Sequence, residues 1–91
     1  MLAAKVDANQ KAIVAGARAC GISVVSLHRV GQGVPDLLLG HAGKTYLAEV
    51  KSAEGKLTKR QKTWLDAWRG QAGVIRSLGD LLRMVGYEAI P

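Results

Sequence analysis

Apolar residues in the first part of the chain recur at intervals of three and four positions, which is the spacing of one helix face. They are Ile13, Val14, Ala17 and Cys20. Asp7 stands before this series with Gln10 three residues later, in the pattern of a capping box, and Gly21 is typical of the position just past a helix. The pattern therefore predicts a first helix between Asp7 and Gly21.

The middle of the chain consists of short apolar runs separated by glycines, which is typical of β-strands. Residues 22–29 are rich in β-branched side chains and predict the first strand. A loop at residues 31–35 follows, and residues 37–39 and 45–51 predict the two strands of a hairpin around a turn at 40–43. We expect the second hairpin strand, which is the most apolar, to be central in the sheet.

Helical spacing returns after Gly55, where Thr58 and Gln61 form a second capping-box pattern. The apolar positions that follow are Trp64, Leu65 and Trp68. We expect this helix to end at the two glycines within residues 70–73. We interpret the two tryptophans as core or interface residues rather than as platforms on which nucleic-acid bases stack.

The remaining segments complete an α/β order. Residues 74–78 predict a fourth strand, residues 80–85 a short last helix capped by Ser77 or Gly79, and residues 87–90 an edge strand or a tail. The order α-β-β-β-α-β-α predicts a single domain over the whole chain, with a mixed β-sheet flanked by helices on both faces.

Composition narrows the class of protein. One cysteine, Cys20, excludes an internal disulfide framework and a cysteine-based zinc site. No apolar run is long enough to span a membrane, and the N-terminal residues lack the apolar stretch of a signal peptide, so we expect a cytoplasmic protein. A formal net charge of +6 on 91 residues favours an anionic partner, most often nucleic acid.

The charge is unevenly distributed along the chain. Residues 1–30 have a net charge of +3 and residues 51–70 of +4, whereas residues 31–50 have a net charge of −1. The acidic residues of the middle segment, Asp36 and Glu49, are thus flanked by basic segments. This layout suits a divalent cation and a polyanion that meet at one site; a chance arrangement in a short chain is the alternative.

Three residues of the predicted hairpin carry candidate chemistry. Asp36 begins the first strand and Glu49 lies near the end of the second, so antiparallel pairing brings them side by side. Glu49 and Lys51 are two residues apart and share one face of the sheet. Two adjacent carboxylates repel each other, and a bound Mg²⁺ or Mn²⁺ removes that cost while activating water for phosphodiester hydrolysis.

The same residues also have a purely structural interpretation, in which Asp36 is a turn residue and Glu49 and Lys51 are an exposed pair on the hairpin. A Pro-Asp pair and a Glu-x-Lys triplet are each common when they occur separately. Their combination across one predicted hairpin in a basic chain favours a nuclease.

The combination of Pro35 and Asp36 with Glu49, Val50 and Lys51 resembles the signature of the PD-(D/E)XK nucleases. More narrowly, nearly the whole chain is similar to the stand-alone VRR-NUC domain, a virus-type replication-repair nuclease module encoded by phages. The further matching residues are Asp7, Asn9, Gln10, Val30, Gly31, Gly33, Leu37, Leu38, Lys56, Leu57, Thr58, Gln61, Trp68, Arg69, Gly70 and residues 77–82.

The resemblance implies a restriction-endonuclease-like core that uses Mg²⁺ or Mn²⁺ and no small-molecule cofactor. Asp36 and Glu49 would be metal ligands, the carbonyl of Val50 would complete the metal shell, and Lys51 would be the catalytic lysine. The resemblance also implies a homodimer that cuts branched DNA, such as four-way (Holliday) junctions, in the cytoplasm of a bacterial or phage-infected cell. Dimerisation would also add buried area to the small core expected of a chain of this length.

Two glutamines each have two interpretations. Many relatives carry a glutamate in the first helix facing the site, where this chain has Gln10, and Gln61 resembles a family glutamine in the helix after the second hairpin strand. Both are therefore candidate catalytic residues. Both are also placed to cap the helices in which they stand.

The candidate DNA contacts lie in the central loop and around the start of the second helix. They are Gly33, Ser52, Lys56, Lys59, Arg60 and Lys62. Positive charge in a first helical turn opposes the helix dipole, which favours phosphate contact over a purely structural role. The backbone of the glycine-containing loop is able to approach DNA closely.

Three functions therefore compete. The first is a metal-dependent, structure-selective DNA endonuclease that reads phosphates and shape. The second is a non-catalytic DNA-binding accessory protein, and the third is a general metal-dependent nuclease without junction preference. A sequence-specific restriction-type nuclease would need additional recognition loops, which this chain does not offer.

Overall fold

A computed structural model describes residues 7–89. Its elements are α1 (Ala8–Ala19), β1 (Ser23–Ser26), β2 (Leu37–His41), β3 (Lys44–Val50), α2 (Lys59–Ala67), β4 (Ala72–Ile75) and α3 (Leu78–Val85). The predicted α/β class and element order are confirmed. Within the described residues, no helix is long and apolar enough to cross a membrane.

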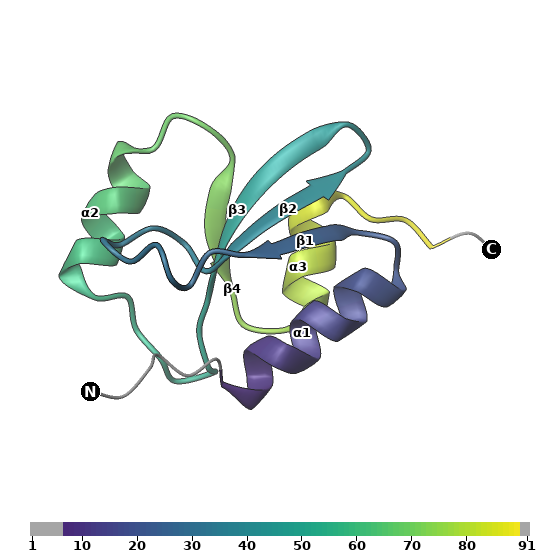
Figure 1. Ribbon diagram of the computed structural model, residues 1–91, viewed down its shortest axis with the longest axis horizontal. Helices are drawn as coiled ribbons and strands as arrows, with labels where there is room; N and C mark the ends of the chain where they lie inside the picture. Colours follow the sequence, from purple (N-terminus) through teal and green to yellow (C-terminus); the bar gives the residue numbers. More distant parts are fainter. Residues whose placement is uncertain (1–6, 90–91) are drawn as a thin grey trace.

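The four strands form one mixed sheet in the order β1-β2-β3-β4 (Figure 1). The first three strands are antiparallel neighbours, and β4 runs parallel to β3 because α2 returns the chain between them. The predicted central position of the second hairpin strand is confirmed, since β3 lies between β2 and β4. Its backbone is therefore held on both edges, which gives the side chains of β3 a rigid support.

The hairpin turn is tighter than residues 40–43 suggest. His41 still pairs with Lys44, so only Ala42 and Gly43 form the turn. Their φ angles of 51° and 77° are those of a type I′ turn, which matches the twist of the flanking strands. The resulting register pairs Leu37 with Ala48.

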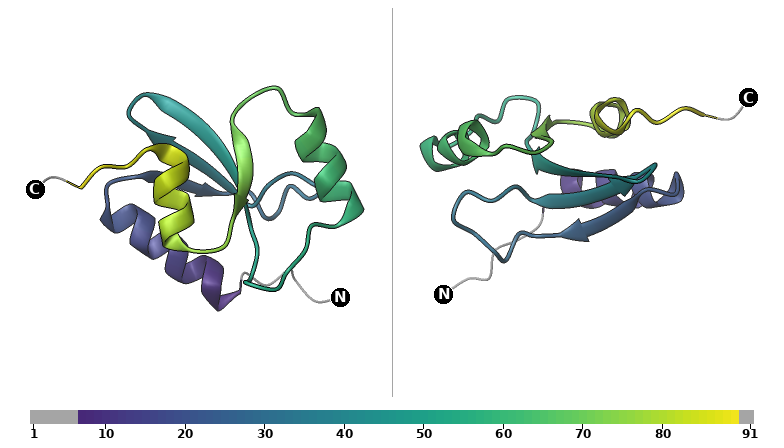
Figure 2. Two further views of the ribbon diagram at one scale, coloured as in Figure 1. Left: turned by 180° about the vertical axis from the view of Figure 1, so that it is seen from behind. Right: turned by 90° about the horizontal axis from the view of Figure 1, so that it is seen from above.

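Both α1 and α3 pack on the same face of the sheet, unlike the expected arrangement with helices on both faces (Figure 2). One continuous core lies between them and the strands, with members from every one of these elements. Its buried residues are Ile13, Ala17, Ile22, Val24, Leu37, Leu39, Tyr46, Ala48, Val50, Ile75, Leu81 and Val85. Helix α2 contributes none, and it lies beyond the strand ends opposite the β2–β3 turn (Figure 1).

Several element boundaries differ from the predicted ones. Strand β1 ends at Ser26, three residues early, because the Leu27 N–H instead donates to the Asp36 carbonyl and closes the central loop. Strand β4 begins at Ala72 and includes Gly73, whose bare Cα lets the Met84 side chain of α3 pack close above it. The predicted cap at Ser77 is confirmed, since its side chain accepts from the Asp80 N–H. Residues 87–89 form no strand, and residue 90 lies outside the described residues.

Candidate active site

The carboxyl groups of Asp36 and Glu49 meet where β2 begins and β3 ends. The pairing of Leu37 with Ala48 sets Asp36 beside Glu49 across the two strands. Ala48 and Val50 point into the core, so the alternation of the strand turns Glu49 toward the opposite face. The two predicted acidic residues are thus brought together, as the hairpin pattern indicated.

Asp36 also completes the backbone hydrogen bonding of β3. Strand β2 starts at Leu37 and offers no strand partner opposite Val50, and the Val50 N–H donates instead to Asp36 Oδ2 at 2.9 Å. The N–H and C=O of one strand residue point toward the same edge, so the Val50 carbonyl faces the side of Asp36 as well. This places a carbonyl oxygen beside the carboxyl pair.

Glu49 is buried with 3% of its surface exposed. The pKa of its carboxyl is raised from 4.5 to about 8, chiefly by burial and then by Asp36, which acts through a hydrogen bond to the protonated form and through its charge. The Lys51 ammonium acts in the opposite direction and lowers the Glu49 pKa. The folded chain therefore holds an acidic pair whose joint ionisation is costly.

Lys51 and Gln61 both contact the same oxygen of Glu49. The Lys51 ammonium lies 3.8 Å from Glu49 Oε2, and Gln61 Nε2 donates to that atom at 3.2 Å. Gln61 is also the capping partner of Thr58: its Oε1 accepts from the Thr58 N–H, and its own N–H donates to the Thr58 hydroxyl. The capping interpretation is confirmed, and the same side chain links the start of α2 to the acidic pair.

Gln10 lies in the first turn of α1, where its N–H donates to the Asp7 carboxylate at 2.7 Å, so the Asp7 cap is confirmed. The Gln10 side chain makes no return hydrogen bond to the Asp7 N–H, so the predicted capping box is only half formed. The residue is 6% exposed on the core side of α1. No hydrogen bond joins its side chain to the acidic pair among residues 7–89. The closer link from α1 is Asn9, whose amide donates to the Lys51 carbonyl at 3.4 Å. Sequence reasoning assigned Asn9 no role, although it stood among the residues that carry the family resemblance.

The oxygen atoms gathered here fit a hard divalent cation. Two carboxylates and a backbone carbonyl are ligands that Mg²⁺ and Mn²⁺ accept while retaining several waters. A cation would also offset the repulsion that raises the Glu49 pKa. Within residues 7–89 no group of three or more His, Cys, Asp or Glu side chains is arranged to hold a metal, so the fit rests on this smaller donor set.

The central loop packs against the basic end of α2. Gly31, Gln32 and Gly33 all have positive φ angles, from 58° to 81°. A Cβ on Gly33 would lie 2.8 Å from the carbonyl oxygen of Arg60, so only glycine permits this close approach. Because Gln61 follows Arg60 in α2, the loop and the acidic pair share one end of the sheet.

The candidate DNA contacts of the basic segment are accessible. Ser52, Lys56, Lys59, Arg60 and Lys62 are exposed. Sequence reasoning missed Arg76, whose guanidinium donates to the carbonyls of Ser52 and Gly55 and so ties the segment after β3 to the end of β4. A single arginine in a polar stretch gave no signal for this long-range contact.

The two tryptophans do not enter the core. Their rings stack at a centroid distance of 4.7 Å with 18° between the planes, and Trp68 is 46% exposed. Trp68 follows α2 as its C-cap in an extended conformation rather than continuing the helix. The expectation of a core role for this pair is therefore wrong, whereas an interface role stays a prediction.

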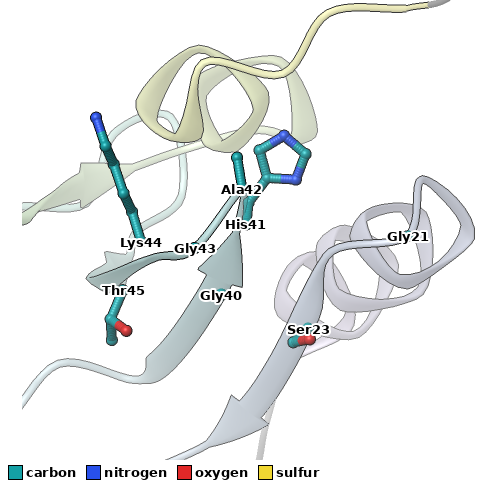
Figure 3. Close-up of a pocket in the computed structure, with 8 residues that line it drawn as sticks. All are labelled: Gly21, Ser23, Gly40, His41, Ala42, Gly43, Lys44 and Thr45. Carbon is teal, nitrogen blue, oxygen red and sulfur yellow. The ribbon is translucent and has the colours of Figure 1, made fainter.

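A separate pocket lies at the far end of the hairpin (Figure 3). Its lining combines glycines 21, 40 and 43 with a few polar side chains, and the Lys44 and Thr45 side chains extend to opposite sides of their strand (Figure 3). None of the predicted site residues lines it. Asp36, Glu49, Lys51 and Gln61 thus lie away from this pocket, and Gln10 lines a different one on α1. Comparison with protein families, curated proteins and solved structures finds no match for this chain.

Proposed function

We propose that this protein is a Mg²⁺- or Mn²⁺-dependent DNA endonuclease with a PD-(D/E)XK-type core, similar to VRR-NUC domains. The observation that carries the proposal is the pairing of the Asp36 and Glu49 carboxyls beside Lys51. The ionised pair is costly to bury, which is typical of residues kept for binding or catalysis, and the sequence segments on either side of the pair are basic. A positively charged surface around two acidic groups suits a metal-bridged phosphodiester.

Each side chain has a role that follows from its contacts. Asp36 and Glu49 would hold the cation, and the Val50 carbonyl would add a third protein ligand; when bound, the cation supplies an acidified water and stabilises charge on the phosphate. Lys51 donates hydrogen bonds and neutralises negative charge that develops near Glu49 Oε2. Gln61 orients Glu49 by donating to the same oxygen, and Gln10, which the family resemblance also implies, makes no such contact within residues 7–89.

We propose branched DNA as the substrate and a homodimer as the active form. Both follow from the family resemblance and from the small size of the chain, which leaves no separate element for reading base edges. Phosphate contacts from Lys56, Lys59, Arg60 and Lys62 would recognise DNA by charge and shape. A two-fold dimer places two sites symmetrically, which suits paired cuts in a symmetric junction.

The test is cleavage of a substrate panel by the purified protein. Linear duplex, flap, splayed and four-way DNAs of equal length and unrelated arm sequences are incubated with Mg²⁺, Mn²⁺ or EDTA. The proposal expects metal-dependent cutting with preference for the four-way DNA. Equal cutting of every substrate would indicate a general nuclease, and tight binding without cutting under any metal would indicate an accessory protein. Light scattering at a mass of about 9.7 kDa would exclude the dimer.

A further inference from the structure

An aromatic pair projects from the end of α2. Trp68 stacks on Trp64 and leaves 46% of its own surface exposed. Helix α2 has no buried residue, so neither indole is needed to fill the core. A single exposed apolar side chain is common on protein surfaces, so the order and the surroundings of Trp68 decide whether it marks a binding surface.

The orientation of Trp68 is set by its neighbours. Its N–H donates to the carbonyls of Trp64 and Leu65, which anchors its backbone to the last turn of α2. Gly70 lies against the edge of the ring, where a Cβ would come within 2.8 Å of the indole nitrogen. The Trp64 ring supports one face of the indole. A side chain held in this way loses little entropy when a ligand stacks on it.

The surroundings of the pair are strongly basic. The segment from residue 56 to residue 69 contains five Lys or Arg residues and one acidic residue, Asp66. A purely apolar protein partner would have to bury or displace these charges, whereas a nucleic-acid strand would pair with them. The combination of an aromatic face and a basic stretch is the arrangement used to bind single-stranded nucleic acid.

The pair also lies in line with the candidate active site. Gln61 and Trp64 are three residues apart on one face of α2, and Trp68, the C-cap that follows the helix, stacks on Trp64. The helical residues from Gln61 to Ala67 rise by about 9 Å, which is the length of about three stacked nucleotides at ~3.4 Å each. Because Gln61 contacts Glu49, a strand that is cut at Glu49 and follows α2 would pass Trp68 a few nucleotides away.

We propose that Trp68 is a stacking platform for an unpaired base of the DNA substrate. This inference rests on the proposed function for the identity of the partner, and it adds a reason for selecting branched DNA. Bases in a continuous duplex are stacked on each other and present no free face, whereas bases at a branch point or in a single-stranded arm do. Stacking does not depend on base identity, so selectivity would follow DNA structure rather than sequence.

The test measures binding in EDTA, where no cleavage occurs. The probes are a splayed DNA with oligo(dT) arms and a blunt duplex with the same number of phosphates. Trp68→Ala should weaken binding to the splayed DNA about 10-fold or more, and weaken binding to the duplex far less. Trp68→Tyr should retain most of the affinity for the splayed DNA, because a smaller aromatic ring still stacks.

Two further variants separate stacking from other effects. Val25→Ala removes exposed apolar surface on β1, remote from α2, and should bind both probes as the wild type does. Lys59→Ala should weaken the binding of both probes alike and reduce the slope of log affinity against log salt by about one unit. Trp68→Ala should leave that slope unchanged. Circular dichroism verifies that each variant is folded.

Three results would overturn the inference. The first is an equal loss of affinity for both probes in Trp68→Ala, and the second is no loss of affinity for either probe. The third is conversion of a dimer to a monomer at unchanged DNA affinity, which would make the tryptophan pair a protein interface. These failures are distinct from failure of the proposed function. If the wild type cuts DNA but Trp68→Ala shows no selective loss of affinity for the splayed DNA, only the stacking role of Trp68 is refuted. If Trp68 is needed to bind the splayed DNA but the wild type cuts no substrate, only the nuclease function is refuted.

Discussion

Replacing Glu49 by Gln should stabilise the metal-free protein much more at pH 8 than at pH 5. Glutamine retains the size of the side chain and an oxygen that accepts from Gln61, but it carries no charge. In the wild type the Glu49 pKa is raised from 4.5 to about 8, chiefly by burial and then by Asp36. The charged form of Glu49 therefore opposes folding, and the substitution removes that opposition.

The direction and size of the effect follow from proton linkage. Below pH 4.5 the folded and unfolded chains both hold the Glu49 proton, and the effect is absent. Between pH 4.5 and about 8 the unfolded chain releases the proton while the folded chain retains it, so the free energy of unfolding falls as the pH rises. The full pKa shift corresponds to on the order of 3–5 kcal/mol of the free energy of unfolding. The wild type loses this stability over the interval, whereas Glu49→Gln does not.

The assay is urea unfolding followed by circular dichroism at several pH values in EDTA. Glu54→Gln is the matched control, because Glu54 lies exposed after β3 and its charge remains in water. Added Mg²⁺ should raise the stability of the wild type at pH 8 and that of Glu49→Gln much less. A stability difference that does not change between pH 5 and pH 8, or a Glu49→Gln variant less stable than the wild type at pH 8, would refute the reasoning.

Further substitutions test the roles assigned to Asp36, Lys51 and Gly33. Asp36→Asn should abolish cleavage yet keep the fold, because its amide oxygen still accepts from the Val50 N–H; Asp36→Ala should cost an additional ~1–3 kcal/mol in urea unfolding by leaving that N–H unpaired. Lys51→Met should lower turnover about 100-fold or more while calorimetry still detects Mn²⁺ binding, and loss of that binding would assign Lys51 a structural role. Gly33→Ala should destabilise the fold by about 1–3 kcal/mol and by more than Gly31→Ala, which meets no atom within 4 Å; equal costs in urea unfolding would contradict the contact with Arg60.

Local rules accounted for most of the fold. The caps at Asp7, Thr58 and Ser77 are short-range hydrogen bonds between residues three apart, and sequence spacing is sufficient to find them. The juxtaposition of Asp36 and Glu49 was also accessible, because a hairpin register depends on a single nearby turn. Sequence spacing therefore predicts contacts that form within one element or one hairpin.

The remaining features depend on contacts between distant segments. The packing of α1 and α3 on one face is a property of how the whole chain crosses the sheet, which no local pattern encodes. The spacing of Trp64 and Trp68 predicts the apolar face of a helix, but α2 has no residue in the core. Their position outside the core therefore could not be inferred from spacing. The carbonyls that Arg76 binds are more than twenty residues away, beyond the reach of any spacing rule.

One comparison decides whether Asp36 and Glu49 together support metal-dependent cleavage of DNA. End-labelled four-way DNA is incubated with the wild type or with Glu49→Gln at matched concentrations, in Mn²⁺ or in EDTA, and the products are separated on a denaturing gel. We expect cleavage only by the wild type in Mn²⁺, with the DNA still bound by Glu49→Gln. Cleavage by Glu49→Gln at the wild-type rate, or cleavage that persists in EDTA, would contradict it.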